Sequence, residues 1–512
     1  MAVTLPFVLL LIDYWPLGRL KVDKNIIFRL VLEKIPLFSL TAVFSLFTIL
    51  THLRSGAIAS VDKLPLDIRI GNALLSYVKY MVKMFWPDRL AILYPHPIDL
   101  PFGEIIGATF LLMVITVMVI LVRKRHPYLI MGWFLYLGTL VPVIGLVQAG
   151  VQAMADRFTY IPLIGLWVMM VYGISEILSG WRYRRTILLP SGILILFILT
   201  IITMRQVNQW QNSIKLFTHT LAVTAPNPLI HNNLGVTFMR QRKDPEALDQ
   251  FRKALKIRPS YADAHSNLGS LLAHQGKDQE AMAHFVQTLQ MKPENAEAHH
   301  ALGVILTKQG KRAEAVVHLS EAVRINPHYE EALYNLGTGL LQLGRVQEAI
   351  YYFNQALRIN PNNAKTHHNL GLALASQGKT QEAISHYEQS LRTNPESADA
   401  HFSLASLLKQ QGRDKDALFH FKEALRMNPS DGQAHYELGT ILFRQGINEE
   451  AVAHLVEAVR IIPNYGEAHL TLGMVYLGMG KKDLALTEYK ILKTINPNLA
   501  NTLYQNISKA SH

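Results

Sequence analysis

The second half of the chain repeats itself with a period of 34 residues, and this feature constrains the fold more than any other. A glycine, an alanine and a proline each recur at that step, and Ala405 replaces the glycine once. The prolines are Pro259, Pro293, Pro327, Pro361, Pro395, Pro429, Pro463 and Pro497. Chance does not produce three registers in step, and a period of roughly 20–50 residues is typical of solenoid proteins.

Each recurring position has a physical task in a unit of two helices. Gly and Ala let the helices approach closely, large residues such as Phe251 and Tyr387 fill the space beside them, and Pro ends the second helix. A second glycine, as at Gly344, supplies the turn between the helices. This is the tetratricopeptide pattern, and it predicts eight units: 228–261, 262–295, 296–329, 330–363, 364–397, 398–431, 432–465 and 466–499.

The expected fold class is all-α: a multi-pass transmembrane helix bundle followed by a tetratricopeptide superhelix, an α-solenoid. We expect a transmembrane domain at 1–204, a connecting helix at 205–227, the repeats at 228–499 and a solvating cap at 500–512. The chain contains no cysteine, which excludes disulfides, thiolate catalysis and Cys-ligated zinc.

First helices of such repeats line a concave groove. At the sixth position of the units stand Asn233, Asn267, Ala301, Asn335, Asn369, Ser403, Glu437 and Thr471. An Asn amide carries a donor and an acceptor, so Asn233, Asn267, Asn335 and Asn369 could hold the backbone of an extended peptide. The units resemble those of O-linked N-acetylglucosamine transferase, in which an asparagine ladder has that role. The alternative is that these asparagines are ordinary residues of a wet surface.

Positive charge accompanies the asparagines on the same groove, where Arg240, His274, Lys308, Lys409 and Arg444 lie. An acidic or extended polypeptide is therefore the expected partner. Histidines recur at the fourth position of seven units, but equivalent residues in stacked repeats are separated by two helix widths, each about 8–10 Å. That column cannot surround one ion, so we expect no metal site.

Five apolar stretches of the first half have the length that a membrane-spanning helix needs. They are Ile35–Leu53, Ile105–Val122, Tyr128–Val147, Tyr160–Leu178 and Thr186–Met204. A sixth run, Val3–Ile12, is too short to cross and lacks the features of a signal peptide, so we expect it to be the remainder of a longer span in a truncated chain.

The distribution of charge sets the expected orientation. Residues 1–204 hold 18 Lys+Arg and 10 Asp+Glu, a net charge of +8, whereas 205–512 hold 32 and 28, a net charge of +4. The excess lies in short basic clusters between apolar runs, as in 123–125 and 182–185, which is typical of cytoplasmic loops. We therefore expect membrane lipids as partners and no nucleic acid, and we expect the repeats to be extracytoplasmic, in a periplasm or an endoplasmic reticulum lumen.

The first outer loop contains an amphipathic stretch, 72–97, which charged side chains interrupt. Lys79 and Lys83 are four residues apart and share one helix face. One interpretation is an interfacial helix whose lysines reach lipid head groups. The other is a cationic wall for a lipid phosphate or pyrophosphate, to which Arg69 and Arg89 contribute.

Asp156 and Arg157 stand in the second outer loop, at the mouth of a span. They could be a solvated pair that fixes the end of the helix, or part of a substrate site, since ionisable groups at membrane depth are often functional. The residues alone leave both interpretations open.

Three stretches of the first half resemble a known family: NALLSYVKYMVKMFWPDRLAILYP (72–95), ADRFTYIPLIGL (155–166) and AVTLPFVLLLIDYWPLGR (2–19). They are similar to transmembrane tetratricopeptide-repeat proteins that act as protein O-mannosyltransferases, within the multi-span glycosyltransferases that use lipid-linked sugar donors. The resemblance implies donor-side roles for Arg69, Tyr80, Arg89, Asp156, Arg157 and Tyr160. It also implies that the family's catalytic acids lie upstream of this sequence, so the catalytic residues are unknown.

Motifs for a phosphate loop, a nucleophile elbow or a zinc-protease helix are not found in the sequence. We therefore expect a membrane-anchored protein with a polypeptide-binding array, glycosyltransferase-like but inactive as this chain alone. The alternative is an active enzyme that transfers sugar from a lipid-linked donor to Ser or Thr of acceptors held by the repeats. No cofactor is expected other than that possible donor.

Overall fold

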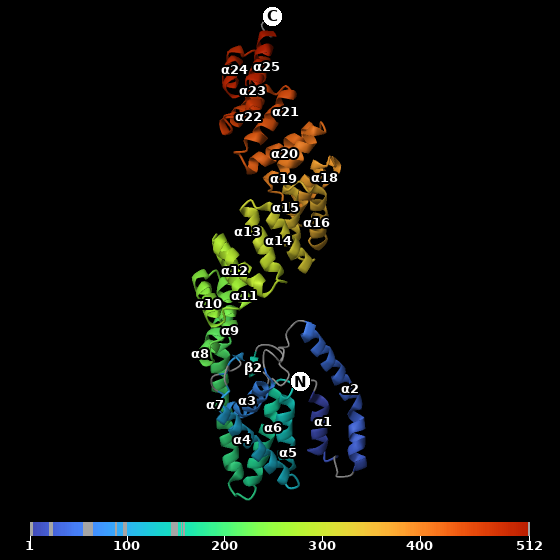
Figure 1. Cartoon of the computed structure of the whole chain (residues 1–512), viewed down its shortest axis with the longest axis vertical. Helices are drawn as coiled ribbons and strands as arrows, with labels where there is room; N and C mark the ends of the chain where they lie inside the picture. Colours follow the sequence, from blue (N-terminus) through green and yellow to red (C-terminus); the bar gives the residue numbers. More distant parts are fainter. Residues whose placement is uncertain are drawn as a thin grey trace. The chain divides into compact units, whose positions relative to one another are not determined.

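A computed structural model describes residues 4–19, 24–54, 65–87, 90–95, 100–144, 152–154, 156 and 159–509. The chain divides into two compact units, Met1–Leu271 and Leu272–His512. Most described residues are helical, which confirms the all-α fold class, and the colours of Figure 1 follow the helices from the N-terminus to the C-terminus. The predicted domain boundaries at 204, 227 and 499 stay predictions.

The membrane segment consists of helices with one short β ladder between them. The helices are α1 (Leu5–Tyr14), α2 (Lys24–Arg54), α3 (Leu66–Phe85), α4 (Phe102–Leu121), α5 (Pro127–Leu140), α6 (Tyr160–Ile177) and α7 (Arg184–Gln209). Strands β1 (Tyr94–Pro95) and β2 (Gln152–Met154) pair antiparallel. The expected connecting helix is divided in two. Helix α7 continues to Gln209, and a separate helix α8 (Ser213–Val223) has Asn212 as its N-cap, whose side chain accepts a hydrogen bond from the Lys215 backbone N–H.

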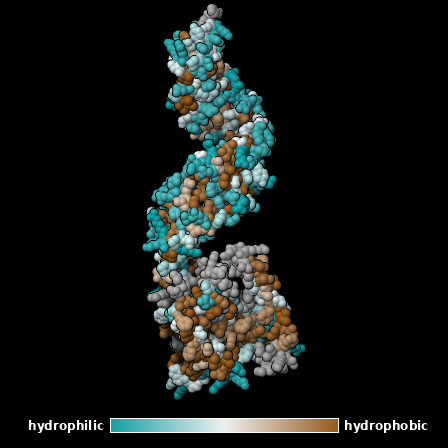
Figure 2. All heavy atoms as spheres, in the orientation of Figure 1, coloured by the Kyte–Doolittle hydropathy of each residue, from teal (hydrophilic) through white to brown (hydrophobic). Residues whose placement is uncertain are grey.

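Within the described residues, four helices are long and apolar enough to cross a membrane: α2, α4, α6 and α7. The first of these spans covers Phe28–Phe47, earlier in the chain than the predicted Ile35–Leu53. The helix in the predicted span Tyr128–Val147 is shorter than expected, because α5 ends at Leu140. Residues 145–147 of that predicted span lie outside the described part. Apolar side chains cover the visible face of this segment in Figure 2, whereas the repeats present mainly polar ones.

The core of the membrane segment explains why α5 is so apolar. Trp133, Tyr136 and Leu140 of α5 are buried, and Tyr80 of α3 joins them. A Cβ atom added to Gly132 of α5 would lie only 2.4 Å from the carbonyl oxygen of residue 165 in α6, so the glycine permits this close crossing. The apolar run of α5 therefore packs largely against protein.

The repeats form consecutive helix pairs at the predicted places. The helices are α9 (Pro228–Arg240), α10 (Asp244–Ile257), α11 (Ala262–His274), α12 (Asp278–Met291), α13 (Ala296–Lys308), α14 (Arg312–Ile325), α15 (Glu330–Gln342), α16 (Val346–Ile359), α17 (Ala364–Ser376), α18 (Thr380–Thr393), α19 (Ala398–Gln410), α20 (Asp414–Met427), α21 (Gly432–Arg444), α22 (Asn448–Ile461), α23 (Gly466–Gly478) and α24 (Lys482–Ile495). A last helix, α25 (Pro497–Lys509), covers the end of the array with buried Ala500, Leu503 and Ile507.

The recurring residues have the roles that their positions predict. Gly337 lies against Phe353 so closely that an added Cβ would be 2.7 Å from the ring. Phe353 itself is fully buried between the two helices of its repeat. The turn glycine Gly344 has φ +75°, a conformation that side chains with a Cβ rarely adopt. The aromatic ring of the unit is therefore buried between the two helices of that unit.

Candidate functional site

A polar cluster in the membrane segment forms where the two short strands pair. Tyr94 of β1 is aligned with Met154 of β2, which brings the stretch before α6 next to the end of α3. As a result, Asp156 lies 3.4 Å from Nζ of Lys83. The end of α3, strand β1 and the much later stretch before α6 therefore share one site.

Asp156 is held mainly through one of its carboxylate oxygens. Its Oδ2 accepts hydrogen bonds from the Tyr94 hydroxyl at 2.7 Å and from the Ala91 backbone N–H at 2.9 Å. Its Oδ1 is buried and makes no hydrogen bond with the described residues beyond its ionic contact with Lys83. Burial, and then the Asp156 carboxylate, raise the pKa of Tyr94 above its ordinary value, so the phenol remains a donor.

A small cavity of ≈140 Å³ adjoins this cluster. Its lining consists of Tyr80, Lys83, Pro87, Leu90, Asp156, Thr159, Tyr160, Leu163 and Trp210. Four of the predicted donor-side residues therefore meet at one place: Tyr80, Lys83, Asp156 and Tyr160. Trp210 and Tyr94 were missed: Trp210 lies outside the three stretches that resemble the family, and Tyr94 lies within 72–95 but carries no charge that singles it out.

Other predicted residues lie elsewhere. Lys79 is exposed on α3, although it is only one helical turn from Lys83. Arg69 is buried near the start of α3 and does not line the cavity. Arg89 and Arg157 lie outside the described residues.

The charges around Lys83 bear on the cationic wall that was one interpretation of the first outer loop. In the described part of the site, the Lys83 ammonium is balanced by the Asp156 carboxylate, and Nζ also contacts the Tyr94 ring at 4.5 Å from its centre. Such a neutral pair has little net attraction for phosphate, whereas an unfilled carboxylate oxygen accepts hydrogen bonds from hydroxyl groups. The described geometry therefore gives Lys83 a counter-charge within the chain, and both interpretations of the first outer loop stay predictions.

A second ion pair in the membrane segment was not predicted from the sequence. Asp13 of α1 is buried, and its Oδ2 lies 2.5 Å from Nζ of Lys34 in α2, while Arg19 contacts Oδ1 at 2.9 Å. Lys34 lies inside the span Phe28–Phe47. The buried carboxylate is what allows a lysine at that depth.

The predicted asparagines of the repeats connect neighbouring units. Nδ2 of Asn267 donates to Asn232 at 2.9 Å, and Nδ2 of Asn335 contacts His300 at 2.9 Å. Nδ2 of Asn369 donates to the Tyr334 hydroxyl at 3.2 Å. In each contact the partner lies 35 residues earlier.

These contacts leave some of the amide groups unused. Oδ1 of Asn335 accepts no hydrogen bond from a described residue, and the side chain of Asn233 makes none within the same ranges, whereas the Asn369 side chain also bonds to the His368 ring. The face formed by the sixth-position side chains, which we call the first-helix face, therefore combines contacts between repeats with free acceptors. A peptide N–H is a suitable donor to such acceptors.

Most of the predicted basic residues of the groove are already paired. Lys308 lies 3.9 Å from Asp278, and Arg444 donates to Asp414 at 3.0 Å. Lys409 contacts Glu437. Arg240 is exposed at the end of α9, without an ion pair to a described residue. The positive charge that we expected on this face is therefore largely neutralised by acids of adjacent units.

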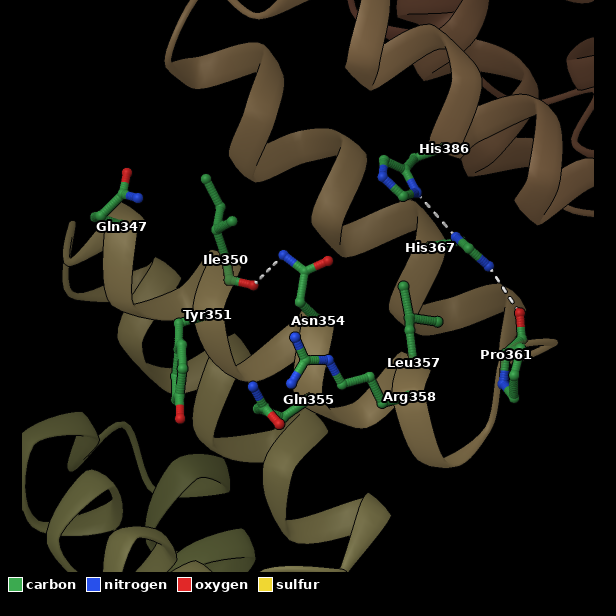
Figure 3. A pocket seen from close by; sticks show the side chains of 10 residues that line it. All are labelled: Gln347, Ile350, Tyr351, Asn354, Gln355, Leu357, Arg358, Pro361, His367 and His386. Carbon is green, nitrogen blue, oxygen red and sulfur yellow. Dashed lines mark hydrogen bonds between the residues drawn. The ribbon is translucent and has the colours of Figure 1, made fainter.

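The recurring histidines have partners that the sequence analysis missed. In four repeats the fourth-position ring faces a second histidine 19 residues later, with Nδ1 atoms 2.8–3.0 Å apart. The pairs are His299–His318, His367–His386, His401–His420 and His435–His454. Nε2 of each first ring also faces a proline carbonyl oxygen, and Figure 3 shows this chain of contacts from Pro361 through His367 to His386.

These contacts assign the ring protons. Nε2–H of His401 donates to Pro395, so its Nδ1 accepts from Nδ1–H of His420. Burial, and then the neighbouring ring, lower the pKa of His420 to about 4. The His pairs are neutral structural contacts, and no group of three or more His, Cys, Asp or Glu in the described ranges is placed to hold a metal ion.

Comparison with protein families identifies the repeats. Models described as tetratricopeptide repeat match residues 262–292, 294–362, 328–396, 364–430 and 415–466, and a TPR repeat model matches 243–276. Among solved structures, the chain is similar to YrrB, a TPR protein with an unusual peptide-binding site, at 24% identity and a TM-score of 0.33, over 36% of this chain and 95% of that one. It is also similar to pilF of Pseudomonas aeruginosa at 24% identity and a TM-score of 0.37, over 40% and 92%.

Curated relatives extend the comparison beyond the repeat family. The chain is 31% identical over 109 residues to Drosophila melanogaster protein O-mannosyl-transferase Tmtc2, which is 21% of this chain and 11% of the relative. It is 27% identical over 143 residues to Mus musculus protein O-mannosyl-transferase TMTC1, 28% of this chain and 15% of the relative. The matched part thus spans well under a fifth of these relatives. The chain thus combines candidate membrane spans with tetratricopeptide repeats, and part of it is similar to TMTC O-mannosyl-transferases.

Proposed function

We propose that this chain is a membrane-anchored protein whose repeats bind polypeptides on the extracytoplasmic side. The observation that carries the proposal is the first-helix face: Asn335 and Asn369 are held in place by contacts to the preceding repeat, and Asn335 keeps its carbonyl oxygen free of described donors. Held acceptors at regular spacing suit the backbone N–H groups of an extended chain, and they do so without reading its side chains.

Peptide binding can be measured on the full chain in detergent micelles, with a peptide array followed by titration of the best ligands. Replacing Asn233, Asn267, Asn335 and Asn369 by Ala removes about 0.5–1.5 kcal/mol each, so affinity should fall by about 2–6 kcal/mol in total. Asn362→Ala changes an exposed loop asparagine and should leave affinity unchanged. Equal binding by the fourfold variant would remove the first-helix face from the proposal.

The proposed orientation is supported by the two basic turns of the membrane segment. Nδ1 of His126, after the first basic turn, lies 2.7 Å from Glu176, just before the second one. The turns therefore lie at the same end of the bundle, and lysine and arginine at one end favour its cytoplasmic placement. Because α5 runs back along α6 from the first turn and α7 leaves from the second, the strand pair and the repeats would then face the other side.

The absence of cysteine makes this orientation directly testable. A single thiol introduced as Ser430→Cys in the repeats or Ser179→Cys between α6 and α7 is the only one in the chain, and both positions are exposed. In sealed right-side-out vesicles, a membrane-impermeant maleimide should label residue 430 and should label residue 179 only after lysis. The reverse pattern would place the repeats in the cytoplasm.

A second proposed function is sugar transfer from a lipid-linked donor to an acceptor bound by the repeats. Two observations favour it: the similarity to protein O-mannosyl-transferases, and the cavity beside Asp156 with its unfilled carboxylate oxygen. Asp156 is the only acid among the described lining residues. We infer that this chain alone binds rather than transfers, because one carboxylate already bonded to Tyr94 and Ala91 is a poor general base.

This inference is tested by incubating the purified chain with a radiolabelled polyprenyl-phosphate mannose and a Ser/Thr-rich peptide. No transfer above the level of the Asp156→Asn variant is expected. Transfer that depends on Asp156 would establish the enzyme instead.

A further inference from the structure

A second pocket opens on the other helices of the array, at the junction of the fourth and fifth repeats. It has a volume of ≈620 Å³ and lies between α16 and the two helices of the next unit. Figure 3 shows Arg358, Asn354 and Gln355 on α16 near the His367–His386 pair. Its described lining contains one arginine and no acid, and none of these residues belongs to the first-helix face.

Arg358 differs from the arginines that occupy the same position in other repeats. Arg324, Arg426 and Arg460 each bind a glutamate three residues earlier, at 2.7, 3.0 and 2.7 Å. In the fourth repeat that glutamate is replaced by Gln355. Within the described ranges Arg358 forms no ion pair, so its charge is left for something outside the chain.

The fifth repeat provides a useful contrast. Arg392 also follows a glutamine, Gln389, but Glu388 lies four residues before it and supplies a negative charge on the same helix face. In the fourth repeat the equivalent of Glu388 is Asn354. Of these five arginines, Arg358 is therefore the one without an acid within one turn before it.

The groups around Arg358 can pair with peptide groups. Nδ2 of Asn354 donates to the Ile350 carbonyl at 2.9 Å, which fixes the amide and leaves its Oδ1 as an acceptor. Gln355 makes no side-chain hydrogen bond with a described residue. The Tyr351 ring, 57% exposed, forms a flat wall at the edge. A carboxylate fills only a small part of such a pocket, and the remaining amide and aromatic surface fits the chain that carries it.

We propose that this pocket binds a glutamate or aspartate side chain of an extended polypeptide, with its carboxylate on the Arg358 guanidinium. An arginine fork matches a carboxylate with two parallel hydrogen bonds, and a charge-assisted bond is about twice as strong as a neutral one. Asn354 and Gln355 then pair with the peptide groups on either side. The array thus has a site that recognises a negatively charged side chain, separate from the first-helix face.

The test uses the full chain in detergent micelles and a short fluorescein-labelled peptide with two adjacent glutamates, amidated at its C-terminus. Fluorescence anisotropy should show binding, and the matched peptide with glutamines should bind at least about tenfold more weakly, since one charge-assisted hydrogen bond is worth about a factor of ten. Arg358→Gln should cause a similar loss. Arg460→Gln removes an arginine at the same position that already has its own glutamate, and should change nothing.

A second variant restores the arrangement of the other repeats without removing the arginine. Gln355→Glu places a glutamate three residues before Arg358, as Glu321 stands before Arg324, and should abolish the preference for the glutamate peptide. Equal binding by the wild type, Arg358→Gln and Gln355→Glu would overturn the proposal. Binding of a glutamine peptide with a free C-terminus but not of the amidated glutamate peptide would also overturn it, since the pocket would then read a chain end. The fourfold Asn variant should keep this glutamate preference, so failure here is distinguishable from failure of the first-helix face.

Discussion

The repeats and the membrane segment build their polar contacts in opposite ways. In the repeats, partners stand at fixed intervals: 19 residues within a His pair, 30 from Arg444 to Asp414, and 35 from Asn369 to Tyr334. In the membrane segment, Asp156 meets Tyr94 across 62 residues through a ladder of only two short strands. A defect in a repeat should therefore stay local, whereas a defect at Asp156 should loosen several segments at once.

The largest expected difference is the ability to fold alone. A fragment that begins near Arg205 should be soluble and strongly helical, because each repeat contacts its neighbours and eight units exceed the roughly three that stability needs. Circular dichroism and a cooperative thermal melt would check this. The fragment 1–204 should require detergent, since large apolar side chains cover its helices. An unordered spectrum from the repeat fragment would contradict the prediction that the repeats fold without the membrane segment.

The next effect concerns a single ring in the array. Phe353→Ala empties a fully buried site, and such truncations cost about 3–5 kcal/mol. In urea melts of the repeat fragment the loss should appear as a lower midpoint. Hydrogen exchange should show it mainly in α15–α18, because the ring packs within its own repeat and against the next. Tyr351→Ala truncates an exposed ring on the same helix and should change the melt little. Exchange rising equally in every repeat would contradict a local defect.

Asp156→Asn should have a smaller but more widespread effect. It keeps the shape of the side chain and leaves the Lys83 ammonium without its counter-charge, and an unsatisfied buried group costs about 1–3 kcal/mol. Hydrogen exchange on the full chain in micelles should rise together at the end of α3, in 90–95 and in 152–154. Glu348→Gln, which breaks the exposed pair with Arg345, is the control and should leave exchange unchanged. A rise confined to one of the three segments would show that the cluster does not join them.

What the sequence could predict follows the same division. The period fixed the helices of the repeats, because each position has the same neighbours in every unit. It also contained a signal for the His pairs, since a second histidine column with members such as His386 and His420 runs 19 residues behind the first. The two helices of one unit bring those columns together, so the 19-residue spacing predicts the His pairs only when both columns are considered.

The ion pairs of the groove cations were also predictable from the period but were not predicted. Lys308 and Arg444 look free along their own helices, but Asp278 and Asp414 stand 30 residues earlier, in the preceding unit. In the membrane segment no period was available. Lys83 and Asp156 were recognised as candidates, but their meeting depends on a strand pair too short to leave a pattern.

The smallest expected effect separates two kinds of repeat by pH. Burial and the neighbouring ring lower the pKa of His318, His386, His420 and His454. In the last repeat Glu488 takes the place of that second histidine, and its hydrogen bond raises the pKa of the fourth-position ring, His469. When folding lowers the pKa of a histidine, the unfolded chain binds more protons than the folded one at pH values below the unfolded histidine pKa of about 6.5. The His pairs therefore contribute stability that is present above that pH and is lost as the pH falls toward 4, the region of the His420 pKa. His469 works in the opposite direction, stabilising at low pH and losing its contribution as the pH rises through its folded pKa.

A matched pair of variants isolates the two contributions. In the first repeat, His231 pairs with Gln250 instead of a histidine, so His420→Gln copies an arrangement that the array already contains. Urea melts of the repeat fragment between pH 7.5 and 5 should show less loss of stability at low pH for His420→Gln than for the wild type, because one titrating ring is gone. His469→Gln should show more loss, because a ring that gains stability on protonation is gone. Each difference should be a fraction of a kcal/mol, since solvent screens these half-buried rings. If both variants shift the pH dependence in the same direction, the partner at the 19-residue interval does not decide how each histidine responds, and the contrast between His–His and His–Glu repeats fails.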